Sequence, residues 1–211
     1  MYYYIDTLAQ LHSYDYIELG LADFGPPGNY FERQVSRWSR QYAETETERL
    51  PEMHELIAWL TRSIPVQERT TIVHGDYSFH NLQCHPTEPR MAAVLDWELS
   101  TIGDPLADFT YFTQPWFAPA GPRSFGGLDL GALGIPTYAA ARDRYCERTG
   151  RVSIQNEDLY RAFHAFRSGA ILQGIIRRAL DGTNASALAF QFSPADVRAG
   201  AQRGLEYARR A

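Results

Sequence analysis

The 211-residue sequence has no lysine, only two cysteines and no long apolar run. All 20 basic side chains are therefore arginine, against 25 acidic ones, and the formal net charge is −5. An acidic chain argues against nucleic-acid binding, which usually needs a basic face. Cys84 and Cys146 are too few for a disulfide framework or a four-cysteine zinc site, and we expect both to be buried thiols. Neither a membrane span nor a signal peptide is predicted, so we expect a cytoplasmic protein.

What the sequence does contain is typical of a folded protein. Apolar residues make up 45% of it and aromatic ones 13%. The length fits one domain, so residues 1–211 are expected to form a single unit. The patterning predicts a helical part over 1–65, a loop and β-hairpin over 70–98, and a second helical part over 104–211. Charge is uneven, with −8 in the first hundred residues and +3 in the rest.

Helices are predicted where apolar residues recur at helical spacing and where proline or glycine marks an end. The expected helices cover residues 4–14, 30–42, 51–62, 136–150, 156–180 and 194–210. Within the longest of them, Tyr160, Phe163 and Phe166 form an aromatic stripe that is more typical of a core than of a ligand site. The Pro- and Gly-rich residues 115–134 predict a long loop.

Three short strands are predicted near the middle of the chain. Residues 70–73 are β-branched, and two further apolar runs occupy 82–85 and 91–95. Because residues 86–90 between these runs are typical of a turn, we expect the two runs to form a hairpin.

The expected register of this hairpin brings two polar side chains together. A turn centred in the middle of the connection makes Leu82 face Leu95 and Asn81 face Asp96, and opposed residues lie about 4.5–5.5 Å apart. An amide oxygen and a carboxylate would then meet at the open end of the hairpin. Such hard oxygen ligands suit Mg²⁺, which shares its remaining positions with phosphate and water. Asp76, on the preceding loop, is placed to accept a proton from an attacking hydroxyl.

Three separated motifs carry a family resemblance. Residues 72–81 read IVHGDYSFHN, residues 94–98 read VLDWE, and residues 103–108 read GDPLAD. Together they resemble the signature of the aminoglycoside phosphotransferases and their relatives, which include choline and homoserine kinases. The resemblance implies a protein-kinase-like fold of the α+β class, and the chain is similar to its mostly helical carboxy-terminal lobe. Residues 8–38 further resemble the kinase-like domains associated with acyl-CoA dehydrogenases.

The resemblance implies a reaction and the residues that perform it. The reaction is transfer of the γ-phosphoryl group of ATP or GTP to a hydroxyl of a small molecule, with Mg²⁺ as cofactor. Asp76 corresponds to the catalytic base, and Asn81 and Asp96 correspond to the two Mg²⁺ ligands. Glu98 is a further acidic candidate beside them.

Three more residues are implied to support the catalytic loop structurally. His74 corresponds to the histidine of the family's catalytic loop. Asp104 is expected to cap the helix that Pro105 begins. Asp108 corresponds to an aspartate that braces the loop through backbone amides, and we expect it to be turned inward.

Two parts of a complete kinase-like enzyme are not found in the sequence, namely a glycine-rich phosphate loop before the catalytic loop and a strand lysine. The glycines of residues 126–134 come after the catalytic loop. We therefore expect a carboxy-terminal lobe with the amino-terminal lobe absent, weak nucleotide binding, and little or no activity, because catalysis depends on positioning the phosphates. A non-catalytic pseudoenzyme or binding module, a truncated gene product, and a lobe completed by another subunit stay open as alternatives.

Overall fold

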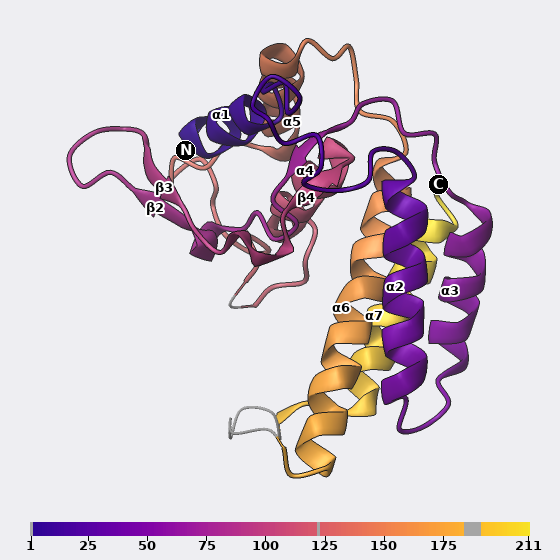
Figure 1. Ribbon diagram of the computed structural model, residues 1–211. Coiled ribbons are helices and arrows are strands. Elements are labelled where there is room, and N and C mark those ends of the chain that lie inside the picture. The colour runs from indigo at the N-terminus through magenta and orange to yellow at the C-terminus, as the bar shows by residue number, and fades with distance from the viewer. Residues whose placement is uncertain (1, 122, 184–190) are drawn as a thin grey trace. The chain divides into compact units, whose positions relative to one another are not determined.

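The computed structural model describes residues 2–121, 123–183 and 191–211. It confirms an α+β architecture that is mostly helical and contains small antiparallel sheets (Figure 1). The chain divides into two compact units. The first comprises Met1–Tyr30 and Gln67–Gln155, and the second comprises Phe31–Val66 and Asn156–Ala211. None of the helices in the described ranges is long and apolar enough to span a membrane.

The first unit combines helices with short strands. Its helices are α1 (Tyr2–Leu11), α4 (Pro105–Phe112) and α5 (Tyr138–Thr149). Its strands are β1 (Thr71–Val73), β2 (Leu82–Cys84), β3 (Met91–Val94) and β4 (Thr101–Gly103). Strand β1 pairs with β4 and β2 pairs with β3, both antiparallel. The sequence analysis missed β4, which has only three residues and no pattern of its own, because its partner β1 lies about thirty residues earlier in the chain.

The β2–β3 hairpin forms, but its register differs from the predicted one. Leu82 pairs with Val94 instead of Leu95. The backbone N–H of Leu95 donates a hydrogen bond of 2.7 Å to the carbonyl of Asn81. Asn81 therefore lies opposite Leu95, and the predicted pairing with Asp96 is wrong.

The physical reason lies in the turn and in an irregularity of the strands. His85 donates a backbone hydrogen bond of 2.9 Å to Arg90, so the turn is centred one residue earlier than expected. The register then shifts between Gln83 and Cys84, as it does where a β-bulge places two residues opposite one. The same strand exposes Cys84, which corrects the expectation of a buried thiol, whereas Cys146 is buried as expected.

An aromatic core fixes α4 in the first unit. Phe109 and Phe112 of α4 are buried, and the Phe109 ring stacks on Tyr145 of α5 with centroids 4.4 Å apart. Helix α4 also packs on β1. At Gly103 a Cβ atom would come within 2.4 Å of the Tyr30 ring, so the strand that leads into α4 needs glycine there. Helix α4 is thus held directly beneath the loop that follows β1.

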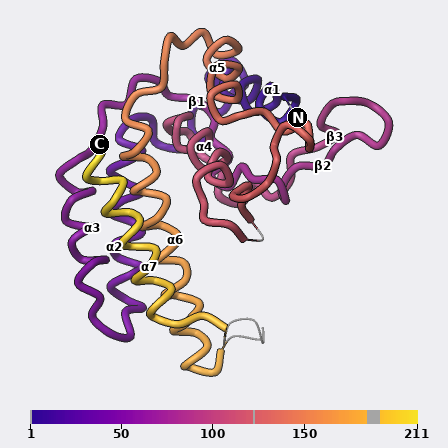
Figure 2. The backbone as a smooth tube through the Cα atoms, turned by 180° about the vertical axis from the view of Figure 1, so that it is seen from behind, coloured from indigo at the N-terminus to yellow at the C-terminus, as the bar shows by residue number. Residues whose placement is uncertain are grey.

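The second unit is a bundle of long helices. It contains α2 (Tyr30–Thr45), α3 (Pro51–Arg62), α6 (Glu157–Leu180) and α7 (Pro194–Ala208). Helices α3, α6 and α7 pack on one another, and Figures 1 and 2 show α2 running alongside them. Tyr160, Phe163 and Phe166 are all buried, which confirms the aromatic stripe as core.

Candidate active site

His74 joins the two loops that carry the motif residues. It is fully buried at the end of β1. Its Nδ1 accepts a hydrogen bond of 3.2 Å from the backbone N–H of Asp76, on its own loop. Its Nε2 lies 2.8 Å from the carbonyl oxygen of Leu95, on the loop after β3. Since Nδ1 accepts from an amide, the proton is assigned to Nε2, which donates to Leu95. One imidazole thus fixes the spacing between the two loops.

The backbone of the first loop requires glycine next to this histidine. Gly75 has a φ of +83°, and a Cβ atom there would come within 2.5 Å of the Leu99 carbonyl oxygen. Trp97 covers the histidine, with its ring centroid 4.8 Å from that of His74 and its Nε1 donating to the Val94 carbonyl. The loop is therefore pressed closely against the segment that follows β3.

Asp108 holds the same loop from below. This residue of α4 is only 1% exposed. Its Oδ2 accepts a hydrogen bond of 2.5 Å from the backbone N–H of His74, and its Oδ1 accepts one of 2.8 Å from Gly75. Two charge-assisted bonds from consecutive amides set both the position and the orientation of the loop.

His12 completes this network, and the sequence analysis did not identify its role. It follows α1, is buried, and lies with Nε2 3.5 Å from Asp108 Oδ2 and Nδ1 2.7 Å from the Tyr145 hydroxyl. Burial alone would raise the pKa of the Asp108 carboxyl, but the hydrogen bond and charge of His12 and the two backbone amides hold that pKa below its usual value. The available signal was that His12 lies one helical turn after the buried Leu8.

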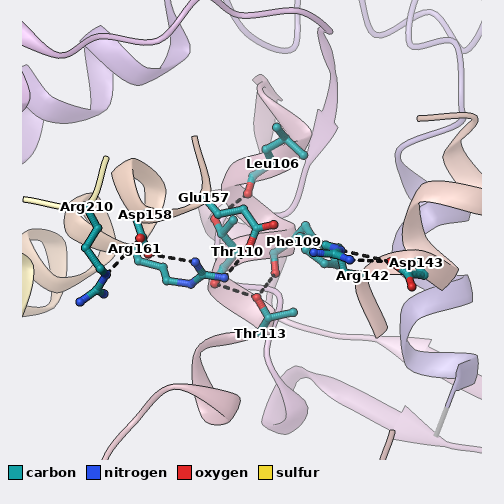
Figure 3. Close-up of polar contacts among 10 residues, drawn as sticks. All are labelled: Leu106, Phe109, Thr110, Thr113, Arg142, Asp143, Glu157, Asp158, Arg161 and Arg210. Carbon is teal, nitrogen blue, oxygen red and sulfur yellow. Dashed lines mark hydrogen bonds and ion pairs between the residues drawn. The ribbon is translucent and has the colours of Figure 1, made fainter. Parts of the chain in front are cut away.

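Asp104 begins the helix that carries Asp108. Its Oδ1 accepts a hydrogen bond of 3.0 Å from the backbone N–H of Leu106, and Pro105 occupies the first helical turn. Within the helix, the hydroxyl of Thr110 donates to the Leu106 carbonyl (Figure 3). The cap and the proline together define where α4 starts, and hence where Asp108 lies.

Asp76 and Asn81 are in direct contact across the loop. The Asn81 side-chain amide donates hydrogen bonds of 2.9 Å to the Asp76 carbonyl and 3.0 Å to Asp76 Oδ2. Asn81 is 9% exposed, whereas Asp76 is partly open to solvent. Within the residues that the structure describes, Oδ1 of each side chain accepts no hydrogen bond. The contact orients the Asp76 carboxylate and leaves its Oδ1, like Oδ1 of Asn81, without a hydrogen bond to a described residue.

Asp96 and Glu98 project from the second loop. Asp96 has φ and ψ of 63°, in the left-handed region that aspartate tolerates better than most residues. Its side chain is exposed, as is that of Glu98, and neither forms an ion pair in the described part of the chain. Backbone strain of this kind is concentrated at functional sites.

The side-chain oxygens of Asn81 and Asp96 are of the kind that hard divalent cations such as Mg²⁺ bind. The register places Asn81 opposite the residue that precedes Asp96. In the described ranges, no three His, Cys, Asp or Glu side chains form a metal-binding group. A carboxylate and an amide oxygen are hard ligands, and Mg²⁺ takes few of them from the protein. The set does not suit zinc, which prefers histidine and cysteine.

Comparison with known proteins now adds to this geometry. Residues 2–144 match the family model described as the phosphotransferase enzyme family. The chain belongs to this family. It is also 44% identical over 188 residues to acyl-CoA dehydrogenase family member 10 of Mus musculus, covering 88% of this chain and 18% of that protein. Member 11 of Gallus gallus is 38% identical over 216 residues, covering 100% of this chain and 28% of that protein. The chain thus spans less than a third of these relatives.

Solved structures of phosphotransferases support the same assignment. A crystal structure from Ralstonia eutropha, described provisionally as an aminoglycoside phosphotransferase, shares 48% identity and superimposes with a TM-score of 0.92. It covers 99% of this chain, and this chain covers 64% of it. A GDP complex of aminoglycoside 2′-phosphotransferase-IIIa, at 13% identity and a TM-score of 0.50, shares the fold alone. The predicted resemblance to this family and to the kinase-like domains of acyl-CoA dehydrogenase relatives is confirmed.

Proposed function

We propose that this chain takes part in transfer of the γ-phosphoryl group of ATP or GTP to a hydroxyl group of a small molecule. The observation that carries the proposal is the pair of hydrogen bonds from the Asn81 amide to Asp76, on a loop fixed from below by Asp108. A carboxylate with one oxygen held and the other open, on a rigid loop, is what a general base for an attacking hydroxyl requires.

In this proposal Asp76 Oδ1 accepts the proton of the acceptor hydroxyl. The acceptor oxygen forms a bond to the γ-phosphorus while the bond from that phosphorus to the β–γ bridging oxygen breaks, and the nucleoside diphosphate leaves. Asn81 Oδ1 and Asp96 would hold Mg²⁺, which when bound neutralises charge on the phosphates. His74 and Asp108 keep the two loops at the spacing that the reaction needs.

We propose that the phosphates are clamped by groups other than a lysine of these 211 residues. The sequence has no lysine, and it spans 64% of the Ralstonia structure. Loss of one preorganised donor costs about 10²–10³ in rate. The 211-residue chain alone is therefore expected to turn over more slowly than about 1 s⁻¹, the low end for kinases.

The test uses ATP hydrolysis, since water can replace an unknown acceptor. The 211-residue chain and the full-length product of its gene are assayed with Mg²⁺. We expect Asp76→Asn to lower hydrolysis by the full-length product about 10²–10⁴-fold, the usual contribution of a general base. Asp23→Asn, which removes an exposed carboxylate of the same unit, is the matched control. Wild-type activity in Asp76→Asn would contradict the assigned role, and no hydrolysis by any form would favour a non-catalytic module.

A further inference from the structure

The solvent-facing side of α2 forms a groove in the second unit. Its volume is about 680 Å³, within the range of small-molecule sites. The residues that line it lie one helical turn after another on this side, and they are Glu32, Arg33, Ser36, Arg37, Arg40, Gln41 and Glu44. The two glutamates come first and last along the helix, so the middle of the groove is lined by arginines and neutral polar side chains.

The arginine spacing works against the stability of the helix. Arg33 and Arg37 are four residues apart, and Arg37 and Arg40 are three apart, so each pair lies side by side on the helix surface. Like-charge pairs at this spacing destabilise a helix by about 0.2–0.5 kcal/mol each. Glu44 is four residues after Arg40, yet no ion pair forms between them in the described part of the chain.

Some other arginines of the same unit form ion pairs with acids. Arg161 binds Glu157 and Asp158, and Arg210 binds Asp158 as well (Figure 3). By contrast, Arg37 and Arg40 are exposed and form no ion pair with a described residue. The Arg37 guanidinium lies 5.4 Å from the Trp38 ring centroid, which limits the positions that it samples.

A further arginine, Arg178 of α6, lies near Gln41, one of the residues that line the groove. The position of a Cβ atom at Gly174 lies 3.4 Å from Arg178 Nη1 and 3.7 Å from Gln41 Nε2. The Arg178 guanidinium and the Gln41 amide therefore both lie close to the same point beside Gly174. Arg178 forms no ion pair with a described residue, whereas its neighbour Arg177 binds Asp181. Arg37 and Arg40 in the groove, and Arg178 close to Gln41, thus form no ion pair with a described residue.

We propose that this groove binds a ligand that bears two or more phosphate groups. The planar guanidinium presents paired N–H donors that match phosphate oxygens, and hydrogen bonds of this kind are stronger than neutral ones. Ser36 and Gln41 add neutral donors between the arginines, and the glutamates at the ends confine the anion to the middle. The site lies within one unit and does not depend on Asp76, so it extends beyond the phosphoryl transfer proposed above.

Calorimetric titration with inorganic pyrophosphate tests the proposal, at low ionic strength and with EDTA to remove metal ions. We expect saturable one-site binding to the 211-residue chain. Arg37→Gln/Arg40→Gln should weaken it by about tenfold or more, because a hydrogen bond to a charged group contributes about 1.5–3 kcal/mol. The control Arg62→Gln/Arg203→Gln removes the same charge from exposed positions of the same unit and should leave the affinity close to wild type. Thermal melting verifies that both variants fold.

Four outcomes would overturn the proposal, the last of them in an Asp96→Ala variant. One is the absence of saturable binding by the wild-type chain. Another is equal weakening in both double variants, which would indicate general charge attraction. The third is citrate binding as tightly as pyrophosphate, which would indicate an unspecific anion site. Asp96→Ala serves as a further check, since retained pyrophosphate affinity places the anion away from the candidate metal site and lost affinity contradicts the groove.

Discussion

The two units differ in what holds them together. In the second unit, long helices pack through apolar and aromatic side chains, and their bounds follow from the sequence pattern. In the first unit, strands of three or four residues surround buried polar groups, among them His12, His74 and Asp108. Fully satisfied polar networks position loops that regular structure cannot hold. The irregular unit is therefore the one in which buried polar groups fix the positions of loops, and it is the unit in which we propose the chemistry.

The largest effect is expected when the polar network is broken at its centre. Asp108→Ala leaves the amides of His74 and Gly75 and the side chain of His12 without their common acceptor. Removing one member of a buried charged pair costs about 3–5 kcal/mol of the free energy of unfolding. Urea denaturation measures this loss. A loss below about 1 kcal/mol, as for an ordinary surface change, would show that the network does not hold the loop.

A second substitution at the same position, Asp108→Asn, tests the pH dependence of this contribution. Because folding lowers the pKa of Asp108, its ionised carboxyl stabilises the native state above the unfolded pKa of about 3.9. That contribution disappears as the pH falls through the lowered, folded-state pKa. The difference in unfolding free energy between the wild type and Asp108→Asn should therefore shrink in acid. A difference independent of pH from 7 to 2 would contradict the ionised state assigned to Asp108.

A matched pair of glycine substitutions compares the two units directly. Gly75→Ala forces a left-handed backbone and a clash with the Leu99 carbonyl, and should cost about 2–3 kcal/mol. Gly204→Ala, in α7, meets the end of the Leu56 side chain and, at 3.3 Å, the Cβ atom of Ala165, but it also gains helix propensity, so a net cost of about 1 kcal/mol is expected. Thermal unfolding measures both. In the full-length product, only Gly75→Ala should lower ATP hydrolysis by more than its loss of stability explains. Equal losses of hydrolysis in the two variants would contradict the difference between the units.

The regular elements could be predicted from the sequence, and the spatial relations could not. Helix α3 was predicted to the residue because Pro51 starts it and an apolar face defines it. The hairpin was predicted as well, but a bulge leaves no mark on an alternating pattern, so its register was wrong by one residue. The contact between His12 and Asp108 joins residues 96 positions apart, and no local pattern reports it.

The candidate site was predictable in composition but not in geometry. The three motifs and their order in the sequence were enough to predict His74, Asp76, Asn81 and Asp96 as residues of the site. It did not reveal that Asn81 donates to Asp76, or that Asp96 has a positive φ. Both features depend on how the two loops meet across the His74 ring, and that contact is tertiary. The assigned roles of these residues stay predictions.

Paramagnetic line broadening by Mn²⁺, used in place of Mg²⁺ together with ADP, tests directly whether the loops that carry Asn81 and Asp96 form a metal site. It detects weak metal binding, so it can be applied to the 211-residue chain. The account predicts broadening centred on the amide signals of Asn81 and Asp96, lost in Asp96→Ala and kept in Asp23→Ala. Broadening centred elsewhere, or unchanged in Asp96→Ala, would contradict a metal site built from these two loops.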